Sequence, residues 1–174
     1  MPAGWYVVEG DVTITPRLDT HGAVNLILKD DCHLTVPWGI NVKEGDTFTI
    51  YAQSTAEASM GKLTACLPEL SDHEKSVWPV AGLSGIGAGV RVWAANDNYY
   101  ENEGTIIING GNIHAKGQQG SSAIGGSDYD RNVSSDGDTP GNLRQGGSIT
   151  INGGIVCTEL RTSGGAHTAD SFGI

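Results

Sequence analysis

Short segments in which apolar and polar residues alternate run along the whole chain, separated by Gly, Asn or Asp residues. Alternation with a period of two residues is typical of β-strands that bury one face. No segment combines apolar residues at helical spacing with helix caps, although 67–77 has room for a short helix or turn. The sequence therefore predicts an all-β protein with strands at 11–15, 24–28, 33–36, 40–42, 47–52, 62–67, 90–94, 105–108, 112–115, 148–151 and 155–159.

The same alternation assigns residues to the interior or the exterior of these strands. One face of each strand is aliphatic or aromatic, and its residues are the expected core: Val24, Leu26, Leu28, Phe48, Ile50, Ile106, Ile108, Ile149 and Ile151. His114 and Cys157 fall on the opposite parity of their strands, so we expect both to face outward.

One passage of the chain occurs twice, at 104–117 and at 147–160, with every matching position displaced by 43 residues. Each copy contains a strand, an Asn-Gly-Gly corner and a second strand, which favours stacked coils, a β-solenoid, over a β-sandwich. At roughly 20 residues per coil the displacement equals two coils, and the chain forms about eight coils, roughly 40 Å tall. Both ends of such a stack expose strand edges and need a cap or a partner, so a homo-oligomer or end-to-end stacking stays open.

Composition limits the size of the protein and the kinds of partner it can bind. The 174 residues suffice for one domain, 1–174, and the chain stops where the Ser-Ala-Ile-Gly-Gly of 122–126 begins to be echoed, so we expect a longer polypeptide. A formal net charge of −10 without a basic cluster disfavours nucleic acid and anionic membranes. No run is long enough for a membrane-spanning helix, so membrane insertion is not expected. The N-terminus shows no basic segment followed by an apolar one, so we expect either a cytoplasmic protein or an export signal outside this sequence.

The three cysteines predict neither a disulfide framework nor a nucleophile. They have no CxxC spacing, and no histidine motif accompanies any of them. Cys32 shares alternate positions with Leu34 and Val36, so it is interpreted as a small buried apolar residue.

Several of these passages together resemble a known class of protein. The stretches 4–15, 24–36, 39–42, 48–51 and 85–89, with the doubled Ile-Asn-Gly-Gly, are similar to secreted or surface-anchored β-helix segments in repeat-bearing proteins of anaerobic gut Firmicutes, often described as carbohydrate-binding. The resemblance implies a right-handed parallel β-helix and an extracellular or cell-surface location. It supplies no catalytic residues. The chain departs from the pattern in two insertions, 67–104 and 126–146, where aromatic and acidic residues replace glycine-rich connections.

The first insertion combines aromatic rings with amide and carboxylate side chains. Sugars bind in water by stacking their C–H faces on aromatic rings while polar groups hydrogen-bond the hydroxyls. The candidate ligand-binding residues are therefore Trp78, Trp93, Asn96, Asp97, Asn98, Tyr99 and Tyr100. Two alternatives stay open: the aromatic residues pack on the solenoid wall as a small satellite core, or they form a protein interface.

The second insertion is rich in aspartate. Calcium accepts six to eight oxygen ligands in irregular geometry, and the candidate metal ligands here are Asp128, Asp130, Asn132, Asp136 and Asp138. The Asp-x-Asp-x-Asn opening mimics an EF-hand loop, but Thr139 stands where the twelfth position needs Glu. A solvated acidic loop without calcium is the alternative.

Taken together, the sequence predicts a non-catalytic extracellular glycan-binding or adhesion module whose partner is a glycan or a surface protein. One alternative is a structural spacer within a stalk. The other is a calcium-dependent polysaccharide-degrading enzyme, in which Arg131 or Arg144 beside the acidic loop abstracts a proton.

Overall fold

The structure, a computed structural model, describes residues 1–68, 83–93, 97–100, 102–118, 121–126 and 147–159. The described residues form fourteen strands and no helix. Expected strands at 47–52, 105–108, 148–151 and 155–159 have the predicted bounds, which confirms an all-β protein. The Asn-Gly-Gly signals at 109–111 and 152–154 end the strands before them, since glycine there allows the chain to turn.

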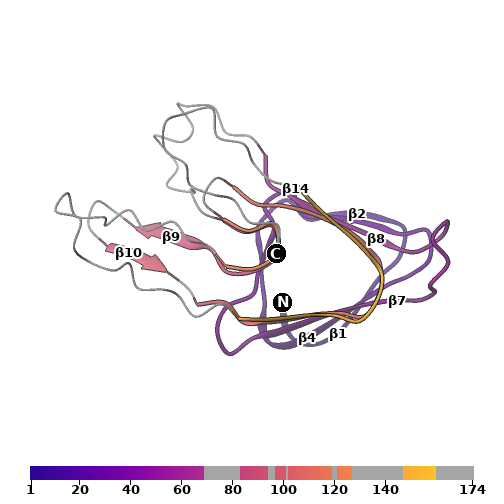
Figure 1. Cartoon of the computed structure of the whole chain (residues 1–174), viewed down its shortest axis with the longest axis horizontal. Helices are drawn as coiled ribbons and strands as arrows, with labels where there is room; N and C mark the ends of the chain where they lie inside the picture. Colours follow the sequence, from indigo (N-terminus) through magenta and orange to yellow (C-terminus); the bar gives the residue numbers. More distant parts are fainter. Residues whose placement is uncertain (69–82, 94–96, 101, 119–120, 127–146, 160–174) are drawn as a thin grey trace.

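Two five-stranded parallel sheets make up most of the structure (Figure 1). Sheet A contains, in spatial order, β1 (Pro2–Val8), β4 (His21–Leu28), β7 (Thr47–Ala52), β11 (Thr105–Ile108) and β13 (Ser148–Ile151). Sheet B contains β2 (Asp11–Thr13), β5 (His33–Thr35), β8 (Lys62–Cys66), β12 (Asn112–Lys116) and β14 (Ile155–Glu159).

A third face is built from very short pairings. β3 (Leu18–Asp19) pairs with β6 (Ile40–Asn41), and parallel bridges continue this row from Ile40 to Ile86 and from Ile86 to Ile124. We call this row sheet C. In chain order the described strands pass from sheet A to sheet B to sheet C and back to sheet A, and each return adds the next strand along the same sheet.

The register of the paired strands gives the number of residues between one strand of a sheet and the next strand of that sheet. In sheet A, Trp5 pairs with Asn25, Val24 with Phe48, Phe48 with Ile106, and Ile106 with Ile149, so successive steps take 20, 24, 58 and 43 residues. The displacement of 43 residues is therefore one step, and our interpretation of it as two coils was wrong. The longer steps contain the two insertions, which lengthen the path without adding a strand to sheet A.

For the same reason, the stack formed by the described residues is lower than the height expected from the sequence. Five strands per sheet among the described residues replace the predicted count of about eight coils. At about 4.8 Å per step, these five strands span roughly 19 Å along the stack.

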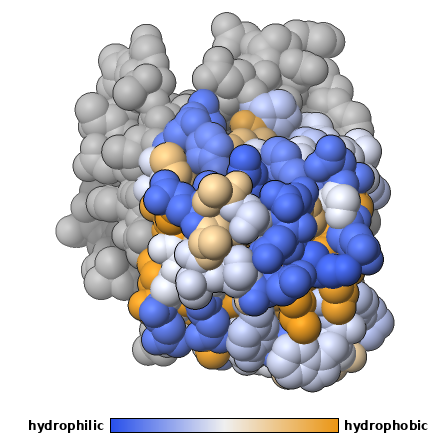
Figure 2. Space-filling view, turned by 90° about the vertical axis from the view of Figure 1, so that its right-hand side faces the viewer, coloured by the Kyte–Doolittle hydropathy of each residue, from blue (hydrophilic) through white to orange (hydrophobic). Residues whose placement is uncertain are grey.

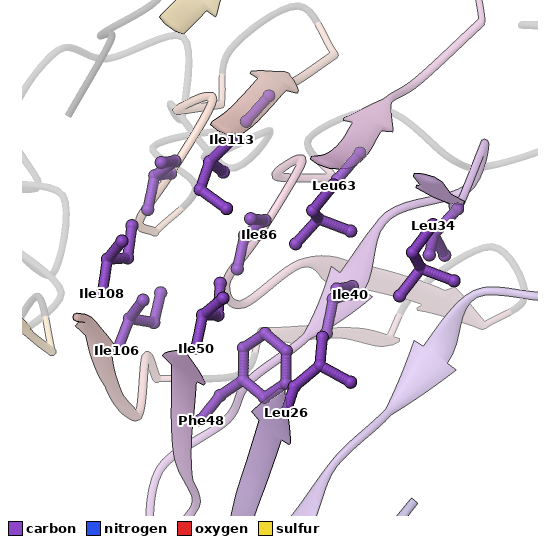
Figure 3. Close-up of a cluster of buried hydrophobic side chains, with 14 of the residues drawn as sticks. Leu26, Leu34, Ile40, Phe48, Ile50, Leu63, Ile86, Ile106, Ile108 and Ile113 are labelled. Carbon is purple, nitrogen blue, oxygen red and sulfur yellow. The ribbon is translucent and has the colours of Figure 1, made fainter. Parts of the chain in front are cut away.

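The core lies between the sheets and is aliphatic except for Phe48 and Cys32 (Figure 3). Leu26, Phe48 and Ile106 from sheet A point toward residues of sheets B and C, and all of these residues are buried: Leu34, Leu63, Ile113, Ile40 and Ile86. Cys32 is buried with them, as predicted. Burying each large aliphatic side chain contributes about 1.5–3 kcal/mol, so this row of contacts is the main source of stability.

Two parts of the core differ from the sequence expectation. Ile149 is half-buried and Ile151 is 43% exposed, although both are in register with buried residues of β11, because β13 is the outermost described strand of sheet A. Leu83, Ile86 and Ala88 are buried, so this part of the predicted insertion 67–104 belongs to the core.

The repeated Asn-Gly-Gly corner joins sheet A to sheet B on the side of the molecule shown in Figure 2, where hydrophilic residues predominate. Asn152 Nδ2 donates a hydrogen bond to Asn109 Oδ1 (2.8 Å), so the two corners stack directly. Gly154 has φ +94° and a Cβ at this position would lie 2.5 Å from Gly111 O. Only glycine fits both the left-handed backbone and this close approach.

Candidate functional site

The aromatic segment singled out from the sequence forms a β-hairpin. β9 (Val90–Trp93) and β10 (Asp97–Tyr100) are the one antiparallel pair of strands in the described parts of the chain. Asp97 pairs with Trp93 and Tyr99 pairs with Arg91. The hairpin extends away from the two parallel sheets (Figure 1). The structure thus brings Trp93, Asp97, Asn98, Tyr99 and Tyr100 into one short two-stranded ribbon, of which only the first strand, expected at 90–94, was predicted from the sequence.

The other candidate residues lie outside the described residues. These are Trp78 and Asn96 in the first insertion and, in the second, Asp128, Asp130, Asn132, Asp136 and Asp138. Within the described ranges, no group of three or more His, Cys, Asp or Glu side chains is placed to hold a metal ion.

A buried carboxyl group lies where the chain returns from the hairpin to sheet A. Glu103 is 8% exposed, and its backbone forms an antiparallel bridge with Lys43. Its Oε2 accepts a hydrogen bond from the Gly147 N–H (3.0 Å), whereas Oε1 has no hydrogen-bond partner among the described residues. Burial raises the pKa of Glu103 because desolvation disfavours the carboxylate. Glu103 therefore ties the chain before β11 to the chain before β13.

An arginine links successive passes of the chain on the sheet C side. Arg17 Nη1 donates to Trp38 O (2.8 Å) and to Ser84 O (2.9 Å), and Nη2 donates to Gly87 O (3.0 Å). The guanidinium fork supplies several donors in fixed geometry, which suits three carbonyl groups from two different segments, at 38 and at 84–87. The clamp fixes the chain three residues before β9, so the hairpin starts from a rigid support.

The outer face of sheet B carries charged and thiol groups. His114 Nε2 lies 2.6 Å from Glu159 Oε1, and Lys116 Nζ lies 3.1 Å from Glu159 Oε2. Hydrogen bonds from Lys116 and His114 lower the pKa of Glu159. His114 is in register with Cys157, as expected from the repeat, and Cys157 is exposed.

The thiol of Cys66 on this face is in an unreactive state. Burial raises the pKa of Cys66 to about 11, and the nearby Glu159 carboxylate adds to the rise. Because only a thiolate is a good nucleophile, Cys66 is not an activated cysteine at neutral pH. The contacts of Glu159 were missed at the sequence level, although the displacement of 43 residues places Glu159 opposite Lys116.

The outer face of sheet A carries an aromatic pair that the sequence analysis also missed. The rings of Trp5 and Tyr51 are stacked, with centroids 5.4 Å apart and an interplanar angle of 29°. Trp5 is 64% exposed. In the sequence, Trp5 and Val7 at alternate positions of a strand could have indicated this pair. The alternation is not visible because all four residues at 5–8 are apolar or aromatic.

Comparisons of this chain with models of protein families, with curated proteins and with solved structures found no match. Among the described residues, no helix has the length and apolar character needed to cross a membrane.

Proposed function

We propose that the scaffold is a right-handed parallel β-helix. The proposal is supported by the strand order, because the described chain visits sheets A, B and C in the same sequence and adds a parallel neighbour at each return. Parallel strands joined by a crossover are connected in the right-handed sense in about 98% of cases. Such a scaffold is rigid, and loops that leave it can carry function.

We further propose that the protein is a non-catalytic extracellular module that binds glycans or mediates adhesion through the hairpin β9–β10. The observation that carries this proposal is the position of the hairpin, which extends from the parallel sheets (Figure 1) while combining aromatic, amide and carboxylate residues within 93–100. Aromatic rings stack on the C–H faces of sugars, and amides and carboxylates satisfy the hydroxyls.

The register of the hairpin divides its aromatic positions between two faces. Directly opposed residues of an antiparallel pair lie on the same face, and successive residues alternate. Positions 93 and 97 are opposed and 99 follows two residues later, so we propose that Trp93, Asp97 and Tyr99 share one face of the ribbon. Tyr100 and Asn98 belong to the other. The proposed sugar platform is the face of Trp93 and Tyr99.

A glycan array with matched variants tests this proposal. Wild-type protein is expected to bind a defined set of glycans, Trp93→Ala and Tyr99→Ala to lose that binding, and Tyr100→Ala to keep most of it. Thermal unfolding of each variant shows whether the fold is intact. A blank array for the wild type, or equal binding by Trp93→Ala, would contradict the proposal.

Calcium is a separate part of the proposal, resting on the aspartates between 128 and 138. A bound ion stabilises the folded protein by mass action, so calcium is expected to raise the melting temperature and a chelator to lower it. Asp130→Asn should reduce this difference. An identical melting temperature in calcium and in chelator removes calcium from the account.

A structural spacer is the second candidate, and the strand edges favour it. β1 and β13 are the outermost described strands of sheet A, and an unpaired parallel edge is a template for another chain. Concentration-dependent end-to-end association, measured by analytical ultracentrifugation together with a blank array, would support a spacer. Calcium-dependent cleavage of an acidic polysaccharide that is lost in Asp130→Asn would instead support the enzyme alternative.

A further inference from the structure

The outer face of sheet A, at its β1 end, has an apolar character unusual for a strand open to water. Trp5 and Val7 occupy alternate positions of β1 and are 64% and 60% exposed, whereas Val8 is buried in the core. Contiguous apolar groups on a surface often mark an interaction site. Trp5 and Val7 are therefore candidates for a role outside the core.

The aromatic pair extends this surface across three strands. Trp5 lies on β1 and Tyr51 on β7, with β4 between them, and their rings meet with centroids 5.4 Å apart. On β4, Asn25 pairs in register with Trp5, and Ile27 pairs with Tyr51. Thr49, the register neighbour of Asn25 on β7, is buried. The result is an aromatic platform beside an amide group, on the flat face of a sheet.

This platform is also uncharged, in contrast to the protein as a whole. The formal net charge is −10. Two neighbouring register rows on the outer face of sheet A contain no acidic or basic residue: Trp5, Asn25, Thr49, Ile107 and Thr150 in one row, Val7, Ile27 and Tyr51 in the other. Immediately beyond this face, Glu9 and Lys29 form an ion pair with each other (2.9 Å).

Sheet B shows that this neutrality is a property of one face. Its outer rows place Asp11 in register with His33 and Lys62, and Lys116 in register with Glu159. An anionic polysaccharide would require cationic groups, and the sheet A rows supply none. A neutral saccharide matches both the aromatic rings and the absence of charge.

We propose that the outer face of sheet A around Trp5 and Tyr51 is a binding surface for a neutral, extended polysaccharide, separate from the hairpin. The Trp5 ring stacks on the C–H face of one sugar residue, and the Asn25 amide hydrogen-bonds a hydroxyl. Tyr51, stacked against Trp5 with centroids 5.4 Å apart, leaves the other face of Trp5 for one sugar residue, and the exposed Val7 on the same strand contacts the next sugar residue. Affinity is therefore expected to rise from the monosaccharide to longer oligosaccharides.

Affinity electrophoresis in gels containing a neutral polysaccharide tests the proposal, with cereal β-glucan, xylan and glucomannan as probes and polygalacturonate as the anionic control. The wild type is expected to be retarded by at least one neutral probe and not by polygalacturonate. Trp5→Ala is expected to weaken that retardation at least tenfold, and Trp5→Phe to retain part of it because a flat ring remains. Trp5→Leu is expected to behave like Trp5→Ala, since a leucine keeps apolar area but no ring.

Two controls separate this surface from the hairpin and from a protein interface. Trp93→Ala should keep the retardation. If Trp93→Ala abolishes the retardation and Trp5→Ala does not, the hairpin proposal stands and this one is overturned. Because Trp5 is largely exposed, its variants should unfold at the wild-type temperature. Absence of retardation by all three neutral probes overturns the proposal. The proposal is also overturned if the wild type self-associates, Trp5→Ala abolishes this self-association, and the Trp5→Ala variant is still retarded.

Discussion

Ile106 and Ile107 are adjacent, chemically identical residues that β11 places on opposite sides of sheet A. Ile106 is fully buried between its register partners Phe48 and Ile149, while Ile107 is half-buried between Thr49 and Thr150. Substituting each by alanine removes the same atoms from the same strand. The pair therefore isolates the effect of the face from the effect of the residue type.

The structure sets the expected size of the two effects. Ile→Ala in a core costs about 2–5 kcal/mol, and Ile106 has paired strands on both sides that limit collapse into the cavity, so we expect about 3–4 kcal/mol. Ile107→Ala loses strand propensity and partial burial, for which we expect less than about 1 kcal/mol. For a chain of this size each kcal/mol lowers the melting temperature by about 2–4 °C, so Ile106→Ala should melt about 6–16 °C below the wild type.

Urea unfolding of the two variants, followed by tryptophan fluorescence, measures both free energies. The dependence of the free energy on urea concentration should stay at the wild-type value, because the surface exposed on unfolding hardly changes. Equal destabilisation by the two substitutions, or a larger effect of Ile107→Ala, would refute the assigned register and with it the core.

Three further predictions concern other contacts. The raised pKa of Glu103 means that the folded protein binds a proton more tightly at this group than the unfolded chain does. The stabilising contribution of Glu103 is therefore present below its ordinary pKa of 4.5 and is lost as pH rises through the raised value. Glu103→Gln should remove this part of the pH dependence of the free energy of unfolding, and an unchanged pH profile would contradict the prediction. Arg17→Ala leaves three carbonyls without a charged donor and should lower the free energy of unfolding by about 2–4 kcal/mol, with Arg17→Lys intermediate. Chemical denaturation measures both losses, and a loss below about 0.5 kcal/mol for Arg17→Ala would show that the hydrogen bonds of Arg17 are unimportant for stability. Iodoacetamide at pH 7.5 should modify the exposed Cys157 before Cys66, whose thiol has a pKa of about 11; peptide mass spectrometry reports the order, and faster labelling of Cys66 would contradict it.

Strands with one clearly apolar face were predictable from the sequence. Thr47–Ala52 and Thr105–Ile108 alternate between core and exterior and are bounded by turn residues, so the apolar alternation and the turn residues indicate the same strand bounds. β1 was missed because Trp5 and Val7 are apolar on the outside while Val8 is apolar on the inside, which removes the alternation. Leu18–Asp19 is too short to show any period.

The number of steps in the stack could not be obtained from the repeat. A displacement of 43 residues is compatible with two short turns or with one turn that contains an insertion, and only strand pairing distinguishes them. The buried row through Ile86 was hidden for a related reason, since this row is joined by single bridges between very short segments, which show no period in the sequence.

The candidate site was predictable in composition but not in arrangement. The aromatic and amide residues of 93–100 stand out in the sequence, yet the antiparallel pairing of β9 with β10 does not. The Trp5–Tyr51 pair depends on stacking across β4 and therefore on contacts between residues far apart in the chain.

The central claim, that the hairpin binds sugar through one face, is tested most directly by the affinity of wild type, Tyr99→Ala and Tyr100→Ala for one glycan that the array identifies. Isothermal titration calorimetry provides these affinities under identical conditions. We predict a loss of about tenfold or more for Tyr99→Ala, equivalent to about 1.4 kcal/mol, and a change of less than about threefold for Tyr100→Ala. Equal losses for both variants, or a loss confined to Tyr100→Ala, would contradict it.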